Sequence, residues 1–324
     1  MESDRLLEKI KGCFLGLAAG DALGVPVEFR SRQDMRVLPI EGMSGYGTWN
    51  QPPGTWSDDS SMTFCLAESL VNGYNLHDIA ARFLRWYREG YWGAHHKVFD
   101  IGGTTQRALA RLRQGKHPLS SGDKDEESNG NGSLMRIVPA ALYFCRLPDL
   151  GFYLGIREVS GITHAHFRSV FSCYLFSELV REILSGRSKQ EALIQASQRV
   201  RMFALENDFN AKEMSLFDRI LSGRIAAAEE SSIRSEGYVL WTLEASIWCF
   251  LNTDDYAQAV LKAVNLGGDT DTTACVTGAL AGLYYGESGI PAHWRKALAR
   301  EKDIVKLSED FTQSLKKRIL PGKD

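Results

Sequence analysis

The sequence predicts an all-α protein that folds as one domain over residues 1–324. Apolar and small residues recur at three- and four-residue steps through most of the chain, which is the period of a helix with one buried face. Sustained alternation of apolar and polar residues, the pattern of a half-buried strand, is absent. Two long apolar segments also carry glycines four residues apart, at Gly12, Gly16, Gly20 and Gly24, and at Gly278, Gly282 and Gly286.

Glycine in a helix costs about 1 kcal/mol relative to alanine, so such rows are tolerable where helix backbones must approach closely. The two glycine-rich segments are therefore expected at the centre of a helical bundle. The helical pattern is clearest, in chain order, over residues 5–24, 61–71, 77–90, 104–114, 169–184, 238–251 and 265–286. Two stretches are predicted to be loops: residues 41–57, rich in Gly, Pro and Trp, and residues 116–133, polar, acidic and expected to be mobile except at their end.

Composition and charge narrow the classes of function. Hydrophobic residues make up 44% of the 324-residue chain and charged residues 24%, which are ordinary values for a globular protein. A net charge of −2 does not indicate binding to nucleic acid or to an anionic membrane. The start of the chain lacks a signal-peptide core, and the apolar stretch from Cys13 is interrupted by Asp21, too early to span a bilayer. The six cysteines stand singly, so we expect reduced thiols and a cytoplasmic protein.

Two pairs of aspartates stand at the starts of apolar helices. Ser57 is a good N-cap with Asp58 and Asp59 in the first turn, and Asp269 and Asp271 flank a threonine in the second motif. Either pair could simply cap its helix. If both helices are central, however, four carboxylates converge, and like charges about 4 Å apart repel by about 4 kcal/mol at an effective dielectric near 20. Oxygen ligands without nearby His or Cys favour Mg²⁺ or Mn²⁺ over zinc, and four aspartates balance two divalent ions.

Three further carboxylates draw attention. Asp100 stands just before a Gly-Gly turn and a helix expected near Thr104, where it either caps the turn or meets a cationic leaving group or acts as a general base. Asp21 lies inside a glycine-row helix, where a charge needs a partner or a water-filled site. Glu28 follows a helix stop and lies on a turn, where exposure to water is a reasonable alternative.

A glycine-rich turn over residues 129–133 leads into a helix for which Ser133 is the expected N-cap and Arg136 lies one turn inside. Its backbone N–H groups and the guanidinium could bind a pyrophosphate. The alternative is an ordinary loop-to-helix junction, which has the same sequence pattern. His164 is either a capping or ligand-stacking histidine or a structural one. Tyr238, at a helix start, either stacks on a base or ribose or belongs to the core.

Taken together, the motifs resemble those of the ADP-ribosylglycohydrolase family, and most of all its bacterial members that act on ADP-ribosyl-arginine. The motifs occur in the family's order from about residue 10 to 290. They are "GCFLGLAAGDALGVPVEF", "GTWSDDSSMTFCLAESL", "FDIGGTT", "GNGSLMRIVPAAL", "THAH", "GYVLWTLEASIW" and "NLGGDTDTTACVTGALAGLYYG". The third motif has Gly103 where the commoner "FDIGNTT" has Asn. This change bears on which leaving group the protein prefers.

The resemblance implies a compact orthogonal multi-helix bundle with a binuclear metal centre in a central cleft. By motif, the implied metal ligands are Ser57, Asp58, Asp59, Asp269, Asp271 and Thr272. The implied catalytic acids are Glu28, Asp59, Asp100 and Asp271. The implied substrate-binding residues are Asp100, Gly102, Gly130, Asn131, Gly132, Ser133, Met135, Arg136, His164 and Tyr238.

The function that follows is metal-dependent removal of ADP-ribose from modified protein side chains, with ADP-ribosyl-arginine as the expected linkage. The expected cofactors are two divalent cations, Mg²⁺ or Mn²⁺. The expected partner is an ADP-ribosylated protein or a small ADP-ribose compound, with no membrane or nucleic acid, and the expected state is a monomer. The alternatives are a non-catalytic or crystallin-like member of the fold, a hydrolase of another ADP-ribose linkage (serine, O-acyl or nucleobase), and a metal-dependent phosphoesterase.

Overall fold

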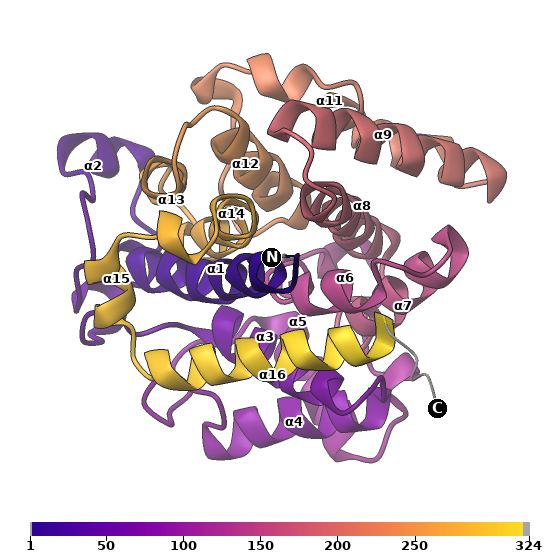
Figure 1. Ribbon diagram of the computed structural model, residues 1–324, viewed down its shortest axis with the longest axis horizontal. Coiled ribbons are helices and arrows are strands. Elements are labelled where there is room, and N and C mark those ends of the chain that lie inside the picture. The colour runs from indigo at the N-terminus through magenta and orange to yellow at the C-terminus, as the bar shows by residue number, and fades with distance from the viewer. Residues whose placement is uncertain (1, 320–324) are drawn as a thin grey trace.

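The computed structural model describes residues 2–319, and within that range the chain forms helices and turns without a β-sheet, as the sequence predicts (Figure 1). Residue 1 and residues 320–324 of the predicted domain lie outside the described residues. The α-helices are α1 (Glu2–Gly24), α2 (Arg32–Val37), α3 (Asp58–Val71), α4 (Leu76–Glu89), α5 (Gly103–Arg113), α6 (Val138–Phe144), α7 (Asp149–Gly161), α8 (Phe167–Leu184), α9 (Lys189–Glu206), α10 (Ala211–Ser215), α11 (Asp218–Leu221), α12 (Val239–Leu251), α13 (Tyr256–Val264), α14 (Thr270–Tyr285), α15 (Ala292–Ala297) and α16 (Glu301–Ile319). Short 3₁₀ turns complete the chain: η1 (Val25–Val27), η2 (Gly47–Trp49), η3 (Pro118–Ser120), η4 (Glu126–Ser128), η5 (Arg224–Ala227), η6 (Glu230–Ser232) and η7 (Glu287–Gly289).

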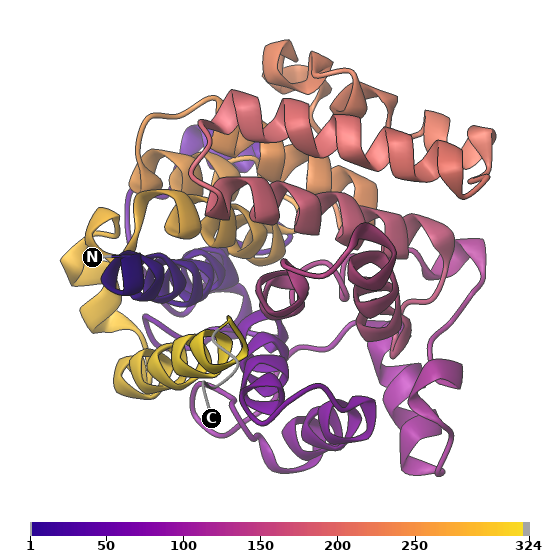
Figure 2. The ribbon, with the colours of Figure 1, turned by 45° about the vertical axis from the view of Figure 1, so that its right-hand side comes forward.

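The two glycine-rich helices, α1 and α14, lie side by side at the centre of the molecule (Figures 1 and 2). They run antiparallel, because Gly16 faces Gly278 while Gly24, further along α1, faces the start of α14. A methyl group on Gly16 would lie 2.6 Å from the Gly278 carbonyl oxygen, closer than real Cβ contacts allow. The predicted close approach of backbones is confirmed. It brings the last turn of α1 against the first turn of α14, where Thr270 Oγ1 donates to the Gly24 carbonyl at 2.8 Å.

Helix α3 starts at the same place. The carboxylate of Asp21 in α1 accepts hydrogen bonds from the backbone N–H groups of Ser57 (2.9 Å) and Ser60 (3.0 Å). Because the first N–H groups of a helix have no partner within the helix, this carboxylate completes the end of α3. Helix α16 packs against α1 and α3, with Phe14 beside Phe311 at a ring distance of 5.4 Å. The end of α1 and the starts of α3 and α14, which are far apart in the chain, thus meet in one place.

A second group of helices covers the other side of α14. Helix α8 packs against α6, α7, α9 and α12, and α12 also contacts α14 (Figure 2). The start of α12 is tied to the glycine-rich turn, because Val239 N donates to the Asn129 carbonyl at 3.0 Å. Tyr238 stands at the N-cap position of α12, as predicted.

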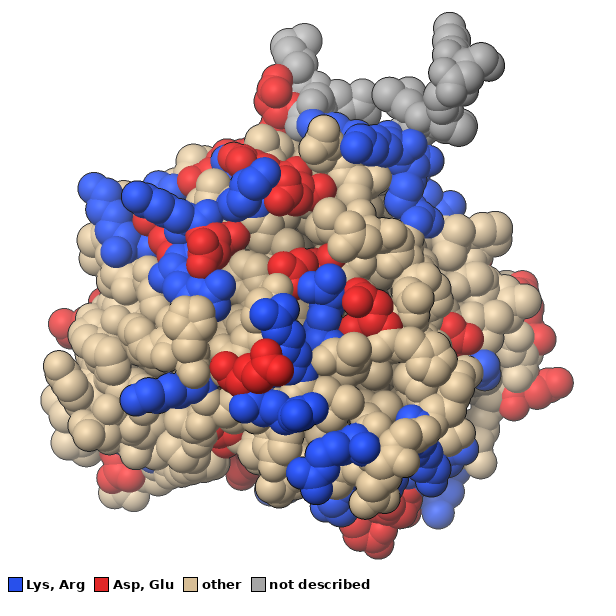
Figure 3. Space-filling model, turned by 90° about the horizontal axis from the view of Figure 1, so that it is seen from below, with Lys and Arg blue, Asp and Glu red and all other residues tan. Residues whose placement is uncertain are grey.

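Helix α1 is long and apolar enough, over Asp4–Val27, to cross a membrane by length and composition alone, but 94% of its most apolar window is buried inside the protein. Its contacts with α13, α14 and α16 account for that apolar surface. The face in Figure 3 carries basic and acidic side chains interspersed, in keeping with a net charge of −2. All six cysteines are free within the described chain, as expected.

Two local predictions need correction. Helix α6 begins at Val138 with Ile137 at the N-cap position, so Ser133 does not cap it, and residues 131–136 form turns instead. The loop 116–133 is anchored rather than mobile. Its Asp123 is buried, forms ion pairs with Arg107 at 2.7 Å and with Arg111, and its backbone N–H donates to the Thr163 carbonyl at 3.1 Å.

Candidate active site and metal centre

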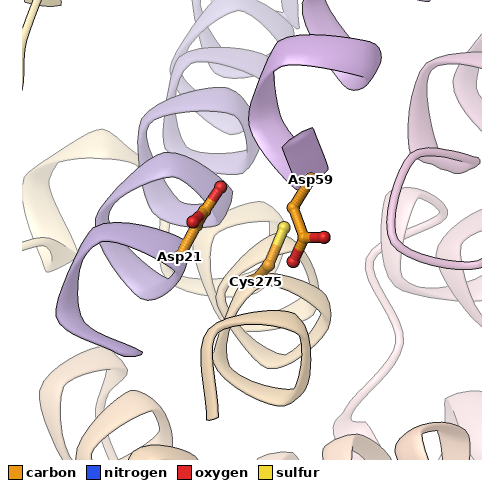
Figure 4. Close-up of side chains that lie close together, drawn as sticks. All are labelled: Asp21, Asp59 and Cys275. Atoms are coloured by element: carbon orange, nitrogen blue, oxygen red, sulfur yellow. The ribbon is translucent and has the colours of Figure 1, made fainter. Parts of the chain in front are cut away.

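The floor of the candidate site is made by the ends of α1, α3 and α14, which bring Asp21, Asp59 and Cys275 together (Figure 4). Both oxygens of Asp21 are engaged, since Oδ2 also accepts from Ser60 Oγ at 2.6 Å. Of the two alternatives for this interior charge, a partner or a water-filled site, the first is confirmed, because the start of α3 supplies the partners. Asp21 therefore holds α3 in place.

Asp59 is buried in the first turn of α3. Its backbone N–H donates to Ser57 Oγ at 3.2 Å, which confirms Ser57 as the N-cap. Thr272 Oγ1, on α14, lies 3.3 Å from Asp59 Oδ1 and donates to it. Asp59 Oδ2 is buried without a hydrogen-bond partner among residues 2–319. Such an orphaned oxygen is unusual in a folded protein and requires an explanation.

A second set of acids lies beside the first. Carboxylate oxygens of Glu28, Asp269 and Asp271 all lie within 4.8 Å of one another. Asp271 Oδ1 accepts from Thr272 N at 2.9 Å, whereas Asp269 Oδ1 is buried and has no hydrogen-bond partner in the described part of the chain. The two aspartate motifs that the sequence singled out are therefore neighbours in space.

Burial and mutual repulsion make these acids hold protons more tightly. Burial, followed by the neighbouring carboxylates, raises the pKa of Asp58, Asp59 and Asp271 well above the usual range. Burial and then Asp100 raise the pKa of Glu28 to about 8, against a hydrogen bond from Trp49 that lowers it. Burial raises the pKa of Asp21 to about 6 even though hydrogen bonds from Ser60 and Ser57 oppose the shift. Ionising the whole cluster thus requires a positive charge nearby.

The donor chemistry fits hard cations. Glu28, Asp269 and Asp271 offer only oxygen, and the orphaned oxygens of Asp59 and Asp269 are free to coordinate. The set that contains Asp21 and Cys275 fits less well. Both Asp21 oxygens are used by α3, and burial, with Asp59 and Asp21 nearby, raises the pKa of the Cys275 thiol well above its usual range. A protonated thiol is a poor metal ligand. The acidic residues of the floor could thus hold a metal through carboxylate oxygens.

The rim of the site carries the remaining predicted acid, Asp100, half-buried just before α5. Burial raises the pKa of Asp100 to about 6, against a hydrogen bond from the Ile101 backbone and with Asp269 raising it further. On the neighbouring loop, Trp49 Nε1 donates to Glu28 Oε2. Glu28 is 5% exposed rather than free in water, so the exposed alternative is wrong.

One wall of the site is built from the glycine-rich turn. Gly130 pairs with Tyr238 through the backbone, and Asn131 N donates to the Gly237 carbonyl at 3.1 Å. Asn131 Nδ2 donates to Asp269 Oδ2 at 2.8 Å, which joins this wall to the acidic floor. A methyl group on Gly132 would lie 2.9 Å from His164 Cε1, so only glycine fits beside that ring.

His164 is buried, and its Nδ1 lies 2.8 Å from Thr163 Oγ1. Burial, followed by the charges of Arg136 and Arg107, lowers the pKa of His164 to about 3. The imidazole is therefore neutral at physiological pH.

Comparison with known proteins shows the family of the chain. The sequence pattern of the family described as ADP-ribosylglycohydrolase matches residues 2–320. The chain belongs to the ADP-ribosylglycohydrolase family.

Relatives within the family share most of its length. The chain is 35% identical over 312 residues to the ADP-ribosylarginine hydrolase Tri1 of Serratia proteamaculans (strain 568), covering 94% of this chain and 79% of that protein. It is 29% identical over 299 residues to the ADP-ribosyl-[dinitrogen reductase] glycohydrolase of Rhodospirillum rubrum, covering 90% of each. A solved structure titled "ADP-ribosylglycohydrolase-related protein complex" superimposes with a TM-score of 0.78 at 34% identity, covering 96% of this chain and 99% of that one. The chain is thus a hydrolase of this family.

Some residues expected at the substrate surface of this ADP-ribosylglycohydrolase lie beneath it. Arg136 is fully buried, and its guanidinium donates to Thr163 Oγ1 at 2.8 Å and to the Gly132 carbonyl at 3.3 Å. Ser133 is fully buried and accepts from Ser160 Oγ at 2.9 Å. Met135 is 4% exposed, whereas Gly102 is exposed at the N-cap of α5. Arg136 and Ser133 hold the turn in shape from behind.

Two contributions to the ADP-ribosylglycohydrolase site were not predicted from the sequence. Trp49 fixes Glu28, and Thr242 Oγ1 accepts from Asn131 Nδ2 at 2.9 Å. The sequence signal for Trp49 is its place in the Gly-, Pro- and Trp-rich loop before the first aspartate pair. Thr242 lies inside an apolar helix with no signal of its own.

Proposed function

We propose that the chain removes ADP-ribose from ADP-ribosylated arginine side chains of proteins, using two divalent cations, Mg²⁺ or Mn²⁺. The observation that carries the proposal is the meeting of Asp59, Asp269, Asp271 and Glu28 at the ends of three helices, with two carboxylate oxygens left without partners within residues 2–319. Relatives of 35% and 33% identity are named ADP-ribosylarginine hydrolases, which supports the choice of linkage.

The cations would be held by carboxylate oxygens of the floor, with the hydroxyls of Ser57 and Thr272 beside them. Divalent ions held there would supply Lewis acidity to the ribose hydroxyls and to the attacking water. Asp58, Asp59, Asp269 and Asp271 could then all be ionised without repelling one another. Asp21 contributes by position alone, since its hydrogen bonds to Ser57 and Ser60 fix the turn that presents Asp58 and Asp59.

Other residues of the site would stabilise the transition state, transfer the proton and bind the ADP-ribose. Glycosidic cleavage passes through an oxocarbenium-like transition state, which nearby carboxylates stabilise. Buried Glu28 and half-buried Asp100 neighbour each other beside Asp269. Their different surroundings suit one of the two to take the proton of the attacking water and the other to contact the departing guanidino group. The wall formed by Gly130, Asn131 and Gly132, with Tyr238 beside it and buried His164 supporting the turn, receives the ADP-ribose half.

The test is release of free ADP-ribose from ADP-ribosyl-arginine by the purified protein, lost on addition of EDTA and regained with Mn²⁺. Serine-, O-acyl- and thymidine-linked ADP-ribose, assayed in parallel, measure the linkage preference. No turnover of any of these substrates in the presence of metal would indicate a binding or crystallin-like protein. Release of AMP or phosphate in place of ADP-ribose would indicate a phosphoesterase, and either result would refute the proposal.

A further inference from the structure

Three aromatic rings line the rim beside Glu28 and Asp100. Phe29 and Trp49 lie with ring centroids 6.3 Å apart, and Trp49 and Phe99 lie 5.7 Å apart. Phe29 is 68% exposed, and the other two rings are half-buried. They come from three separate segments of the chain, so the row is a product of the fold.

Phe29 is held in a costly conformation while leaving its ring in water. Its φ is +66°, a left-handed backbone that bulky residues rarely adopt and that costs about 1–3 kcal/mol. The backbone is fixed there, since Phe29 N donates to the Gly268 carbonyl at 2.7 Å. Tyr46, on the same loop as Trp49, is likewise 60% exposed with φ of +66°. Core packing does not explain an exposed ring in such a position.

The aromatic row is continuous with the acids of the site. Phe29 directly follows Glu28, Phe99 directly precedes Asp100, and the Trp49 indole N–H donates to Glu28. A group that leaves the scissile bond at these two acids passes beside the three rings. The glycine-rich wall meets the floor through a different acid, since Asn131 donates to Asp269.

We infer that the Phe29–Trp49–Phe99 rim binds the polypeptide that carries the modified arginine, and that Phe29 determines preference for protein over small-molecule substrates. This inference rests on the proposed function, which places ADP-ribose against the glycine-rich wall. Aromatic faces suit this occupant because they stack on a guanidinium and pack against peptide backbone and apolar side chains. The carboxyl oxygens of Glu28 and Asp100 beside the rings can accept hydrogen bonds from the same guanidinium.

The experiment compares two substrates that share one scissile bond: free ADP-ribosyl-arginine and a folded protein ADP-ribosylated on arginine. Phe29→Asn removes the ring while keeping a residue type that tolerates positive φ. We expect kcat/KM for the protein substrate to fall roughly 3- to 30-fold further than kcat/KM for the free substrate, chiefly through KM. Leu205→Ala, which trims a 75% exposed side chain on α9, leaves both values unchanged.

Trp49→Phe separates docking from damage to Glu28. This variant keeps an aromatic ring but loses the N–H that holds Glu28, so both substrates should slow by similar factors through kcat. If Phe29→Asn also slows both substrates equally, Phe29 acts only through Glu28 and the inference is overturned. If Phe29→Asn changes kcat/KM for neither substrate, the inference is overturned as well. If the unaltered protein hydrolyses neither substrate, the proposed function itself has failed.

Discussion

The floor and the rim of the site are built in contrasting ways. The floor consists of helix ends locked by backbone contact, where Gly24 lies against the Asp271 backbone without room for a methyl group and Asp21 caps α3. The rim consists of loops that place Phe29 and Tyr46 in left-handed conformations with their rings in water. Acids buried at the floor can be ionised only with cations, whereas rings at the rim are free to meet a large partner. In the proposed function, the floor would set the chemistry and the rim would set which substrates reach it.

The largest effect is expected from breaking the floor's frame. Gly16→Ala places a methyl group 2.6 Å from the Gly278 carbonyl oxygen and 3.0 Å from the ring of buried Tyr256, so the backbone of α14 must shift. We expect the free energy of unfolding to fall by about 3 kcal/mol or more, measured by urea denaturation. The matched control is Gly151→Ala in α7, where the new methyl group meets Leu147 Cβ at an ordinary 3.6 Å. This control should leave the free energy of unfolding unchanged or raise it slightly. Equal losses in both variants would refute the close backbone contact between α1 and α14.

Next in size is the loss of one floor acid. Asp271→Asn keeps the shape of the side chain and removes its charge, so a folded protein should result. We expect ADP-ribose release to drop on the order of 10³-fold with weaker Mn²⁺ binding, measured by steady-state kinetics and calorimetry. Asp208→Asn, at an exposed aspartate after α9, should retain full activity. Normal turnover by Asp271→Asn would show that the floor is not the reactive centre.

A smaller effect is expected from pH on the metal-free protein. The folded-state pKa of Glu28 is raised to about 8 and that of Asp21 and Asp100 to about 6, so stability present at low pH is lost as pH rises through these values. In EDTA, Tm should fall between about pH 4 and 8, which runs from the ordinary pKa of these carboxyl groups to the raised values. Saturating Mn²⁺ should restore about 2.7 kcal/mol at 100 times Kd, and more at the higher pH. The same Tm profile with and without metal would contradict the proposed coupling.

The smallest effect concerns the link between the wall and the floor. Asn131→Ala removes the N–H groups given to Asp269 and Thr242 at 2.8 and 2.9 Å. Loss of such hydrogen bonds costs about 1–2 kcal/mol, so KM should rise roughly tenfold with little change in kcat. Asn131→Asp, which brings a charge to Asp269, should be more harmful than Asn131→Ala. The reverse order would indicate that the amide serves the substrate alone.

Features that depend on neighbouring residues could be predicted from the sequence, whereas features that depend on residues far apart in the chain could not. The glycine rows and the Ser57 N-cap are local signals, and both predictions are confirmed. The start of α6 was misplaced at Ser133 because Arg136 and Ser133 form hydrogen bonds with distant Thr163 and Ser160, which no local pattern reveals. The capping of α3 by Asp21 is likewise a contact between residues far apart in the chain. The aspartate motifs were recognised, but their spacing and the Trp49 contact required the fold.

The most direct measurement is calorimetric titration of the metal-free protein with Mn²⁺, followed in the same samples by release of ADP-ribose from ADP-ribosyl-arginine. We predict two bound ions per chain and activity that rises with their occupancy. Full activity in EDTA, or titration with no binding up to millimolar Mn²⁺, would contradict a metal centre at the meeting point of α1, α3 and α14.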